Sequence, residues 1–158
     1  MPWQIDSKNY SLRLVPRNRY QQDFEMKTYR LAAGDGLTGL RRIDITPAAL
    51  GDRDVRIAMR AAALNFRDLA FARGQYDVPP GHEVVPLSDG VGTVVEIGSA
   101  VTRFAVGDRV IATFWPNWID GDISPLKSSS SFGAHIDGTL TELMPSVNPP
   151  STRHGPLS

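Results

Sequence analysis

Gly90-Val91-Gly92-Thr93-Val94-Val95-Glu96-Ile97-Gly98 is the stretch of sequence that decides the fold. β-Branched residues dominate it and a glycine stands at each end, which indicates a buried strand bounded by turns. After a short connection, Gly107-Asp108 forms a turn that leads into a second strand, predicted over residues 109–114. Two strands this close together, with no helical pattern between them, favour a β-rich domain.

Most of the other segments with a clear period are strands as well. Residues 55–60 alternate apolar and polar side chains, as a half-buried strand does. Residues 65–73 have helical spacing instead, with Phe66, Leu69 and Ala70 on a face expected to join the core. Further strands are predicted over residues 26–31, 40–45 and 138–143. The chain is therefore predicted to be mainly β, a partly open β-barrel with short helices.

The two ends of the chain differ from this body. Residues 1–25 show no sustained period, and they carry several arginines with few acids. A mitochondrial transit peptide has a similar composition, but a flexible, solvated extension is the favoured interpretation. Residues 145–158 are rich in Pro and Ser and are expected to be disordered. A single domain over residues 26–144 is predicted, which suits a chain of 158 residues.

Composition argues against several classes of function. Seventeen basic residues balance seventeen acidic ones, so nucleic acid is not expected as a partner. No apolar run approaches the roughly 18–20 residues that span a bilayer, and the N-terminus lacks the layout of a secretory signal. The absence of cysteine excludes disulfides and thiolate zinc sites, and it fits a reducing compartment. A cytoplasmic protein without a membrane partner is the expectation.

A glycine pattern at Gly34-x-Gly36-x-x-Gly39 matches the dinucleotide-binding fingerprint letter for letter. That fingerprint works only if a helix opens at the third glycine and presents its N-terminus to the pyrophosphate. Here the next segment alternates like a strand and meets Pro47 within eight residues. We interpret the glycines as a hairpin turn.

Gly81-His82-Glu83 resembles a metal-binding tripeptide in the same superficial way. A metal site needs at least three converging ligands, and the chain offers only His82, His135 and His154 with no cysteine. A loop histidine beside a solvated glutamate is the favoured interpretation, so no metal ligand is predicted.

A longer, ordered set of motifs carries more weight. The set begins with Ala63-Leu64-Asn65-Phe66-Arg67-Asp68-Leu69 and continues with Val85-Pro86-Leu87-Ser88-Asp89. The strand quoted above follows, and then Val106-Gly107-Asp108-Arg109-Val110. The set ends with Gly138-Thr139-Leu140-Thr141-Glu142. Over about residues 26–143 the chain resembles the N-terminal GroES-like catalytic domain of the medium-chain dehydrogenase/reductase superfamily. Its motifs are most similar to those of the zinc-free quinone oxidoreductase and alcohol dehydrogenase-like branch.

The resemblance implies that the catalytic zinc of other members is absent. Asn65 falls where zinc-dependent members carry a metal-binding Cys, and Ser88 and Asp89 fall where they carry a His and a Glu. Arg67 takes the position of a proton-relaying Ser or Thr, and Asp68 that of an acid in the outer coordination sphere. Leu87-Ser88-Asp89, and not Gly81-His82-Glu83, is thus the counterpart of the family's Gly-His-Glu.

Without a Lewis acid, hydrogen-bond donors must polarise the substrate carbonyl. Four catalytic candidates follow: Asn65, Arg67, Asp68 and Ser88. Asn65, Phe66 and Arg67 are also the candidates for binding the nicotinamide end of the cofactor. The candidates for substrate binding are Tyr76, Asp89, Trp115 and Trp118, since flat rings suit flat conjugated substrates.

Each candidate has a structural alternative. For Asn65 the alternative is that it simply caps the following helix, a role that Asn favours. Arg67 and Asp68 have the alternative of a solvated ion pair, and Ser88 and Asp89 that of a simple turn into the strand. Trp115 and Trp118 have the alternative of packing against a missing domain.

The resemblance implies hydride transfer from NADP(H) or NAD(H) to a carbonyl, enone or quinone-type small molecule. The family's Rossmann domain would follow residue 143, where only a Pro-rich segment remains, so we expect a truncated chain that is inactive alone. The exposed cleft face is then expected to favour self-association. A non-catalytic remnant or interaction module that retains only the barrel is the alternative.

Overall fold

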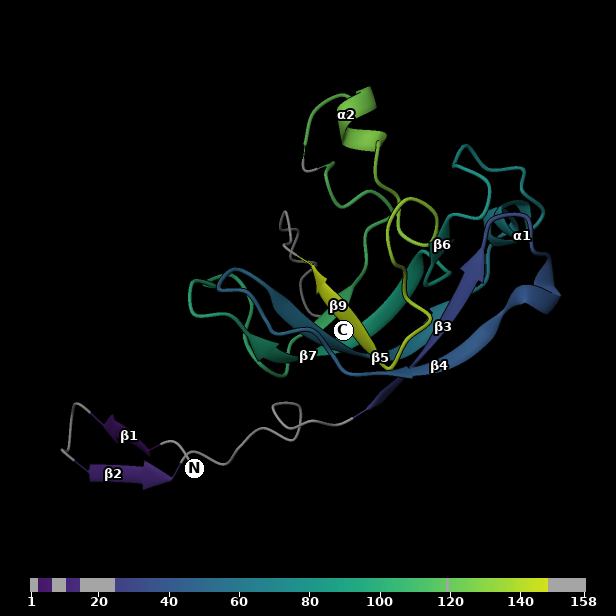
Figure 1. Ribbon diagram of the computed structural model, residues 1–158. Coiled ribbons are helices and arrows are strands. Elements are labelled where there is room, and N and C mark those ends of the chain that lie inside the picture. The colour runs from purple at the N-terminus through teal and green to yellow at the C-terminus, as the bar shows by residue number, and fades with distance from the viewer. Residues whose placement is uncertain (1–2, 7–10, 15–24, 119, 148–158) are drawn as a thin grey trace.

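A computed structural model describes residues 3–6, 11–14, 25–118 and 120–147 of the chain. The described residues are mainly β with short helices, as predicted (Figure 1). In chain order the elements are β1 (Trp3–Asp6), β2 (Ser11–Leu14), β3 (Met26–Ala32), the 3₁₀ helix η2 (Leu37–Gly39), β4 (Arg41–Ile45), β5 (Val55–Ala63), α1 (Phe66–Ala72), β6 (Glu83–Val84), β7 (Asp89–Ile97), β8 (Arg109–Ile111), α2 (Pro125–Ser128) and β9 (Leu143–Val147).

The largest sheet has the strand order β8-β7-β5-β9, and every pair in it is antiparallel. β7 is the glycine-bounded strand of the sequence, and it pairs along its whole length with β5. Gly92 is required in this pair, since a β-carbon there would stand 2.4 Å from Ile57 Cγ2 and 2.6 Å from the Ala58 carbonyl oxygen. The register sets Ala63 opposite Asp89. The end of β5 and the start of β7 therefore lie together, which is where the predicted site residues stand.

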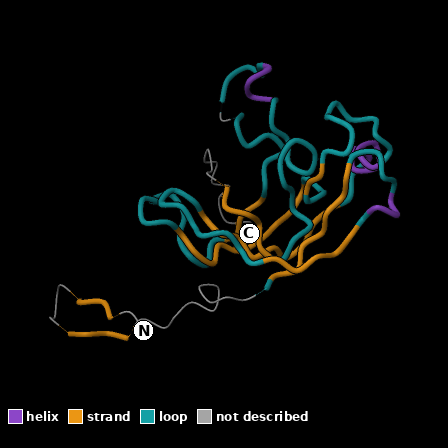
Figure 2. The backbone as a smooth tube through the Cα atoms, viewed as in Figure 1, coloured by secondary structure: helices purple, strands orange, loops and turns teal. Residues whose placement is uncertain are grey.

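A second sheet has the order β4-β3-β6, and the end of the domain ties it to the first. Thr28 of β3 forms an isolated bridge with Thr141, and the Tyr29 N–H donates to the Leu140 carbonyl oxygen at 3.2 Å. Most strands gather in the lower part of the view, whereas both α-helices lie above them, together with some of the loops (Figure 2). The start of α1 and the loop after β8 thus lie beside the start of β7, where they line one pocket.

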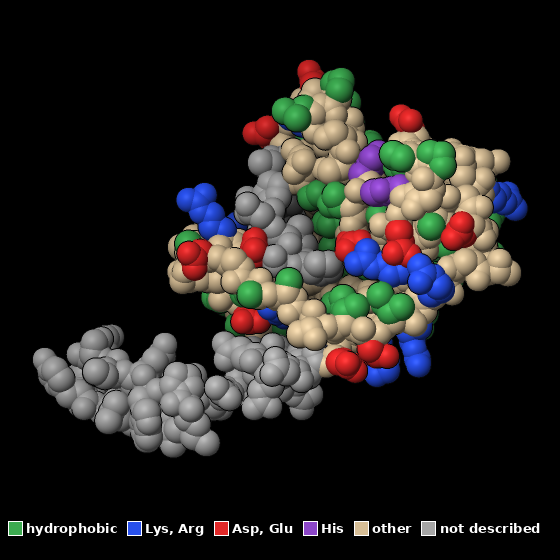
Figure 3. Space-filling model, in the orientation of Figure 1, with side chains coloured by type: hydrophobic (Ala, Val, Ile, Leu, Met, Phe, Trp, Pro, Cys, Tyr) green, Lys and Arg blue, Asp and Glu red, His purple; other side chains and the backbone are tan. Residues whose placement is uncertain are grey.

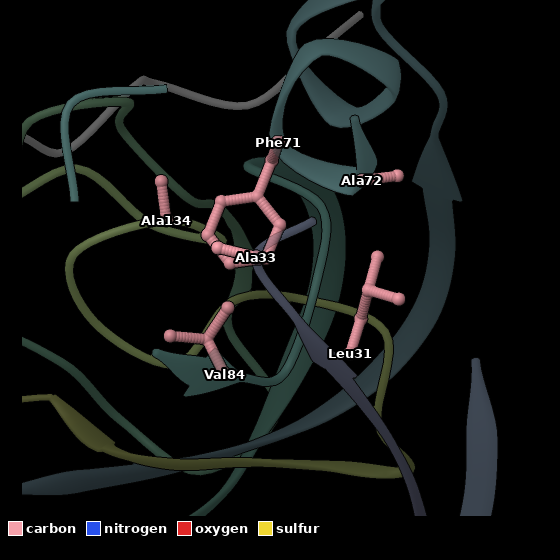
Figure 4. Close-up of a cluster of buried hydrophobic side chains, with 6 residues drawn as sticks. All are labelled: Leu31, Ala33, Phe71, Ala72, Val84 and Ala134. Atoms are coloured by element: carbon pink, nitrogen blue, oxygen red, sulfur yellow. The ribbon is translucent and has the colours of Figure 1, made fainter. Parts of the chain in front are cut away.

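One hydrophobic cluster packs α1 against the second sheet (Figure 4). Its members are Leu31, Ala33, Phe71, Ala72, Val84 and Ala134. The prediction that Phe66 joins the core is wrong, because Phe66 is 78% exposed, whereas Leu69 and Ala70 are half-buried. Phe66 is the first residue of the helix, and the apolar residues of the helix that are fully buried, Phe71 and Ala72, belong to its last turn.

The C-terminal part of the domain differs from prediction. The strand expected over residues 138–143 is instead β9, which runs from Leu143 to Val147. The predicted start of a disordered tail at residue 145 is therefore wrong for residues 145–147, since Val147 pairs with Val55. β9 contains Pro145, which has no backbone N–H, and it lies at the edge of its sheet, where a proline is tolerated. Residues 148–158 of the predicted tail lie outside the described residues.

The N-terminal region also holds regular structure where none was predicted. Within residues 1–25, β1 and β2 form an antiparallel hairpin, with Trp3 opposite Leu14. This hairpin lies apart from the two larger sheets (Figure 1). Among the residues that the structure describes, no helix has the length and apolar character that a membrane crossing requires.

Candidate functional site

Helix α1 begins at the site, and Asn65 is its N-cap. The residue has extended backbone angles, and its N–H donates to Asp68 Oδ2 at 2.8 Å. Asp68 is three residues along the helix, so its carboxylate satisfies a backbone donor as in a capping box. Asn65 does occupy the N-cap position, while its side-chain amide bonds to another group.

An open pocket of about 330 Å³ lies beside this helix end. Its lining residues are Asn65, Phe66, Arg67, Ser88, Asp89 and Phe114. Five of these six were candidates from the sequence, and they come from the start of α1 and the start of β7. Phe114, from the loop after β8, had no site role in the sequence analysis, because nothing in its neighbourhood along the chain distinguishes it from an ordinary packing residue.

The polar groups on one wall of the pocket bond to each other. The Asn65 side-chain amide donates to Asp89 Oδ2, and the Ser88 hydroxyl donates to Asp89 Oδ1 at 3.4 Å. Ser88 is fully buried, whereas Asp89 is half-buried. One N–H of the Asn65 amide is thus engaged by Asp89, and its second N–H remains as a donor.

Arg67 contributes the positive charge of the site. Its Nη1 donates to the Phe132 carbonyl oxygen at 2.7 Å and its Nη2 to Ser131 Oγ at 3.2 Å. The guanidinium carbon lies 4.9 Å from the ring centroid of Tyr76 and 4.7 Å from that of Phe114, within cation–π range. The side chain is only 14% exposed. The alternative of a solvated ion pair is therefore wrong.

Asp68, the next residue of the helix, is buried. Its Oδ1 is 3.9 Å from Arg67 Nη1 and has no hydrogen-bond partner among the described residues. Burial raises the pKa of the Asp68 carboxyl above 3.8, although the Asn65 N–H and the Arg67 charge act in the opposite direction. Asp68 is thus a carboxyl group that the fold pushes toward its neutral form.

The aromatic residues predicted as a substrate wall lie around this pocket without lining it. Tyr76 packs against Phe71 and against His135, with its ring also beside Arg67. Trp115 packs edge-on against Phe114, with the ring centroids 4.8 Å apart, and the ring centroids of Trp118 and Trp115 are 5.6 Å apart. A substrate role for these three rings stays a prediction.

Neither of the two short motifs forms a site. After Gly34 and Gly36 the chain makes the 3₁₀ turn η2 and enters β4, so no helix faces the glycines. Glu83 belongs to β6 and forms an ion pair with Arg41. Acidic and basic side chains lie next to one another on the face that Figure 3 shows. Across the described ranges, no group of three or more His, Cys, Asp or Glu residues could hold a metal ion.

Leu87, just before Ser88, has an unusual backbone. Its φ is +71°, the left-handed region that favours glycine, and it is the one non-glycine residue with positive φ in the described part of the chain. The resemblance predicts a glycine at the position of Leu87, and glycine adopts such a φ readily. The alignment of Leu87-Ser88-Asp89 with the family's Gly-His-Glu stays a prediction.

Comparisons with known proteins agree with this architecture. The sequence profile of the alcohol dehydrogenase GroES-like domain matches residues 51–146. A zinc-type alcohol dehydrogenase-like protein of Schizosaccharomyces pombe is 37% identical over 92 residues, which are 58% of this chain and 27% of that protein. The quinone oxidoreductase of Pseudomonas aeruginosa is 44% identical over 84 residues, 53% of this chain and 26% of the enzyme.

A solved structure gives the same result. A protein described as an alcohol dehydrogenase from Sinorhizobium meliloti superposes with a TM-score of 0.65 at 28% identity, covering 80% of this chain and 38% of that one. The chain therefore spans between about a quarter and two fifths of the length of these relatives. The chain belongs to the alcohol dehydrogenase GroES-like domain family of the medium-chain dehydrogenase/reductase superfamily.

Proposed function

We propose that this chain forms the substrate-facing part of a zinc-independent, NAD(P)H-dependent oxidoreductase that transfers hydride to a carbonyl, enone or quinone-type small molecule. The pocket at the start of α1 carries the proposal, because it sets N–H donors of Asn65 and Arg67 beside the exposed ring of Phe66. Such donors stabilise the negative charge that develops on a carbonyl oxygen when hydride adds to the conjugated system.

The donor set of the pocket does not suit zinc. It offers an amide at Asn65, a hydroxyl at Ser88 and one carboxylate at Asp89, with neither thiolate nor imidazole. Zinc in proteins is bound mostly by Cys and His, with three protein ligands even at open catalytic sites. The Asp89 carboxylate is moreover engaged by Asn65 and Ser88.

A bound nicotinamide would supply the hydride. The residues of this chain would then do two things: orient the acceptor carbonyl through Asn65 and Arg67, and hold its flat body against Phe66 and Phe114. Because the half-buried Arg67 is fixed by the Phe132 carbonyl, it needs no reorganisation as charge develops.

Ligand binding by the purified chain tests the site. Cinnamaldehyde, an enal, and duroquinone are titrated while bound ligand is followed by saturation-transfer NMR. We expect saturable binding that weakens about tenfold or more in Arg67→Met, since a hydrogen bond from a charged group contributes about 1.5–3 kcal/mol. Arg73→Met, at the exposed C-cap of the same helix, is the control and should bind like the parent.

Equal affinity of the Arg67→Met and parent chains would contradict the proposal, as would a tenfold gain in affinity on adding Zn²⁺. NADPH consumption in the presence of duroquinone separates the oxidoreductase from a binding module. If a version of the chain extended by a cofactor domain binds the ligand saturably but never oxidises NADPH, the alternative is favoured, namely a non-catalytic interaction module that retains the barrel.

A further inference from the structure

A continuous line of polar contacts runs from the pocket wall through the buried Ser131 to the half-buried His135. Arg67 Nη2 lies 3.2 Å from Ser131 Oγ, and Ser131 Oγ lies 2.9 Å from His135 Nδ1. The Ser131 backbone N–H also points at His135 Nδ1, at 3.3 Å. Ser131 is fully buried, so water does not compete for its hydroxyl. These contacts join α1 to a loop more than sixty residues away along the chain.

The direction of each hydrogen bond follows from the partners. A backbone N–H can only donate, so His135 Nδ1 accepts from Ser131 and a neutral ring carries its hydrogen on Nε2. A guanidinium can only donate, so Ser131 Oγ accepts from Arg67. The Ser131 hydroxyl hydrogen is then left for His135 Nδ1. The two hydrogen bonds of Ser131 Oγ are thus compatible: it accepts from Arg67 Nη2 and donates to His135 Nδ1.

This arrangement restrains the guanidinium at two points. The Phe132 carbonyl holds Nη1 and Ser131 Oγ holds Nη2, while the Tyr76 ring lies against both Arg67 and His135. Without the serine hydroxyl one of the two hydrogen bonds remains, and the ring contacts with Tyr76 and Phe114 fix the direction of the guanidinium N–H groups less tightly. Arg67 lines the pocket, so its orientation decides where the positive charge faces.

We propose that Ser131 is a positioning residue, whose hydroxyl, oriented by His135, holds the Arg67 guanidinium at the pocket wall where it meets the substrate oxygen. The inference rests on the proposed function for the identity of the ligand, although the restraint on Arg67 exists without it. Ser131 itself does not line the pocket, so it acts through Arg67.

A double-mutant cycle with cinnamaldehyde as the probe tests the role. Ser131→Ala should weaken binding about fivefold to tenfold in the parent chain and have no further effect in Arg67→Met, because the two side chains act as a unit. Ser131→Thr, which keeps the hydroxyl, should restore most of the affinity. Ser129→Ala is the control, since within the described ranges the Ser129 hydroxyl bonds only to the nearby Leu126 carbonyl. Additive losses in the cycle would overturn the proposal.

A second measurement needs no ligand. The Arg67 charge lowers the pKa of the Asp68 carboxyl, so a guanidinium that turns away lets that pKa rise. Titration by carbon-13 NMR should show a higher Asp68 pKa in Ser131→Ala than in the parent, and no change from Ser131→Ala when Arg67 is already Met. An unchanged Asp68 pKa would overturn the positioning role. If the parent chain binds no probe while this pKa still rises, the proposed function fails and the positioning role stands.

Discussion

Gly138 packs against the backbone of Leu87 so closely that a β-carbon on Gly138 would stand 1.9 Å from the Leu87 carbonyl oxygen. The same β-carbon would lie 2.8 Å from the Pro86 carbonyl oxygen and 2.8 Å from the Gly133 nitrogen. All three atoms belong to the backbone, so no side-chain rotation can relieve the contact. The segment that carries Ser88 into the pocket is thus supported directly by residues near the end of the domain.

Gly138→Ala should therefore destabilise the fold by about 3 kcal/mol or more, at the upper end of what overpacking costs. Urea denaturation followed by circular dichroism measures the loss. Gly81→Ala is the matched control, because Gly81 has a φ of +72° and open space around it, so only a backbone cost of about 1–2 kcal/mol is expected. Equal losses for the two variants would contradict the close packing at Leu87.

The left-handed backbone of Leu87 predicts an inverted order of stability for two substitutions. Leu87→Ala and Leu87→Gly both remove a buried side chain, which costs roughly 2–5 kcal/mol. Glycine additionally relieves the positive φ, so Leu87→Gly should unfold at a higher urea concentration than Leu87→Ala, by about 1 kcal/mol. Elsewhere glycine is normally the less stable of the two. The usual order at residue 87 would show that the strain is absent.

Asp68 predicts a pH dependence of stability. Its folded-state pKa is raised by burial, so the folded protein holds the proton more tightly than the unfolded chain does. The contribution of Asp68 to the free energy of unfolding is therefore most favourable below pH 3.8 and falls as pH rises through the folded-state pKa. Asp68→Asn keeps an acceptor for the Asn65 N–H and removes the titration.

The measurement is the difference in unfolding free energy between Asp68→Asn and the parent, by urea denaturation over a series of pH values. The unfolding free energy of Asp68→Asn, relative to that of the parent, should increase as pH increases. A difference that stays constant, or that shrinks with pH, would be incompatible with a raised Asp68 pKa.

Replacing each of two phenylalanines on α1 by alanine should affect the stability of the fold to very different extents. Phe71 is 1% exposed and central to the cluster of Figure 4, so Phe71→Ala should cost about 3–5 kcal/mol. Phe66 is five residues earlier and 78% exposed, so Phe66→Ala should change the unfolding free energy by about 0.5 kcal/mol or less. Thermal denaturation of the pair shows whether Phe66 is available for a ligand or engaged in the core.

Exposed apolar side chains beside the pocket also predict association. Leu64 and Phe66 are 83% and 78% exposed on either side of Asn65. Exposed apolar groups that cluster favour protein contacts. Sedimentation velocity should show self-association of the chain at high concentration, reduced in Leu64→Ser/Phe66→Ser. A chain that is monomeric throughout the concentration series would refute this expectation.

Local sequence patterns predicted much of the fold. β-Branched runs between glycines located β7, and helical spacing after an Asn located α1 with its cap at Asn65. The family resemblance predicted that Ser88 and Asp89 lie in the same site as Asn65. The pairing of β5 with β7 does place these residues together. These signals are short-range, or they come from an ordered set of motifs, so one sequence was sufficient.

Contacts between distant residues could not be predicted in this way. The roles of Phe114 and Ser131 depend on packing against α1, and no local period distinguishes them. The low exposure of the Arg67 side chain was not predicted, because an arginine beside an aspartate is ordinarily solvated. Residues 138–140 were taken for a strand, yet their N–H groups donate to carbonyls of residues 85–87, which fixes them as a loop.

The contact between the first and last parts of the domain bears on how the chain acquires its structure. The Lys27 N–H donates to Glu142 Oε2 and the Glu142 N–H to the Lys27 carbonyl oxygen, across 115 positions of sequence. Closing a loop of that size costs roughly 4 kcal/mol of chain entropy by logarithmic scaling. High contact order of this kind slows folding. On the ribosome, the two sheets cannot be joined until residue 142 has left the exit tunnel, so until then the nascent domain exposes strands that a chaperone can recognise.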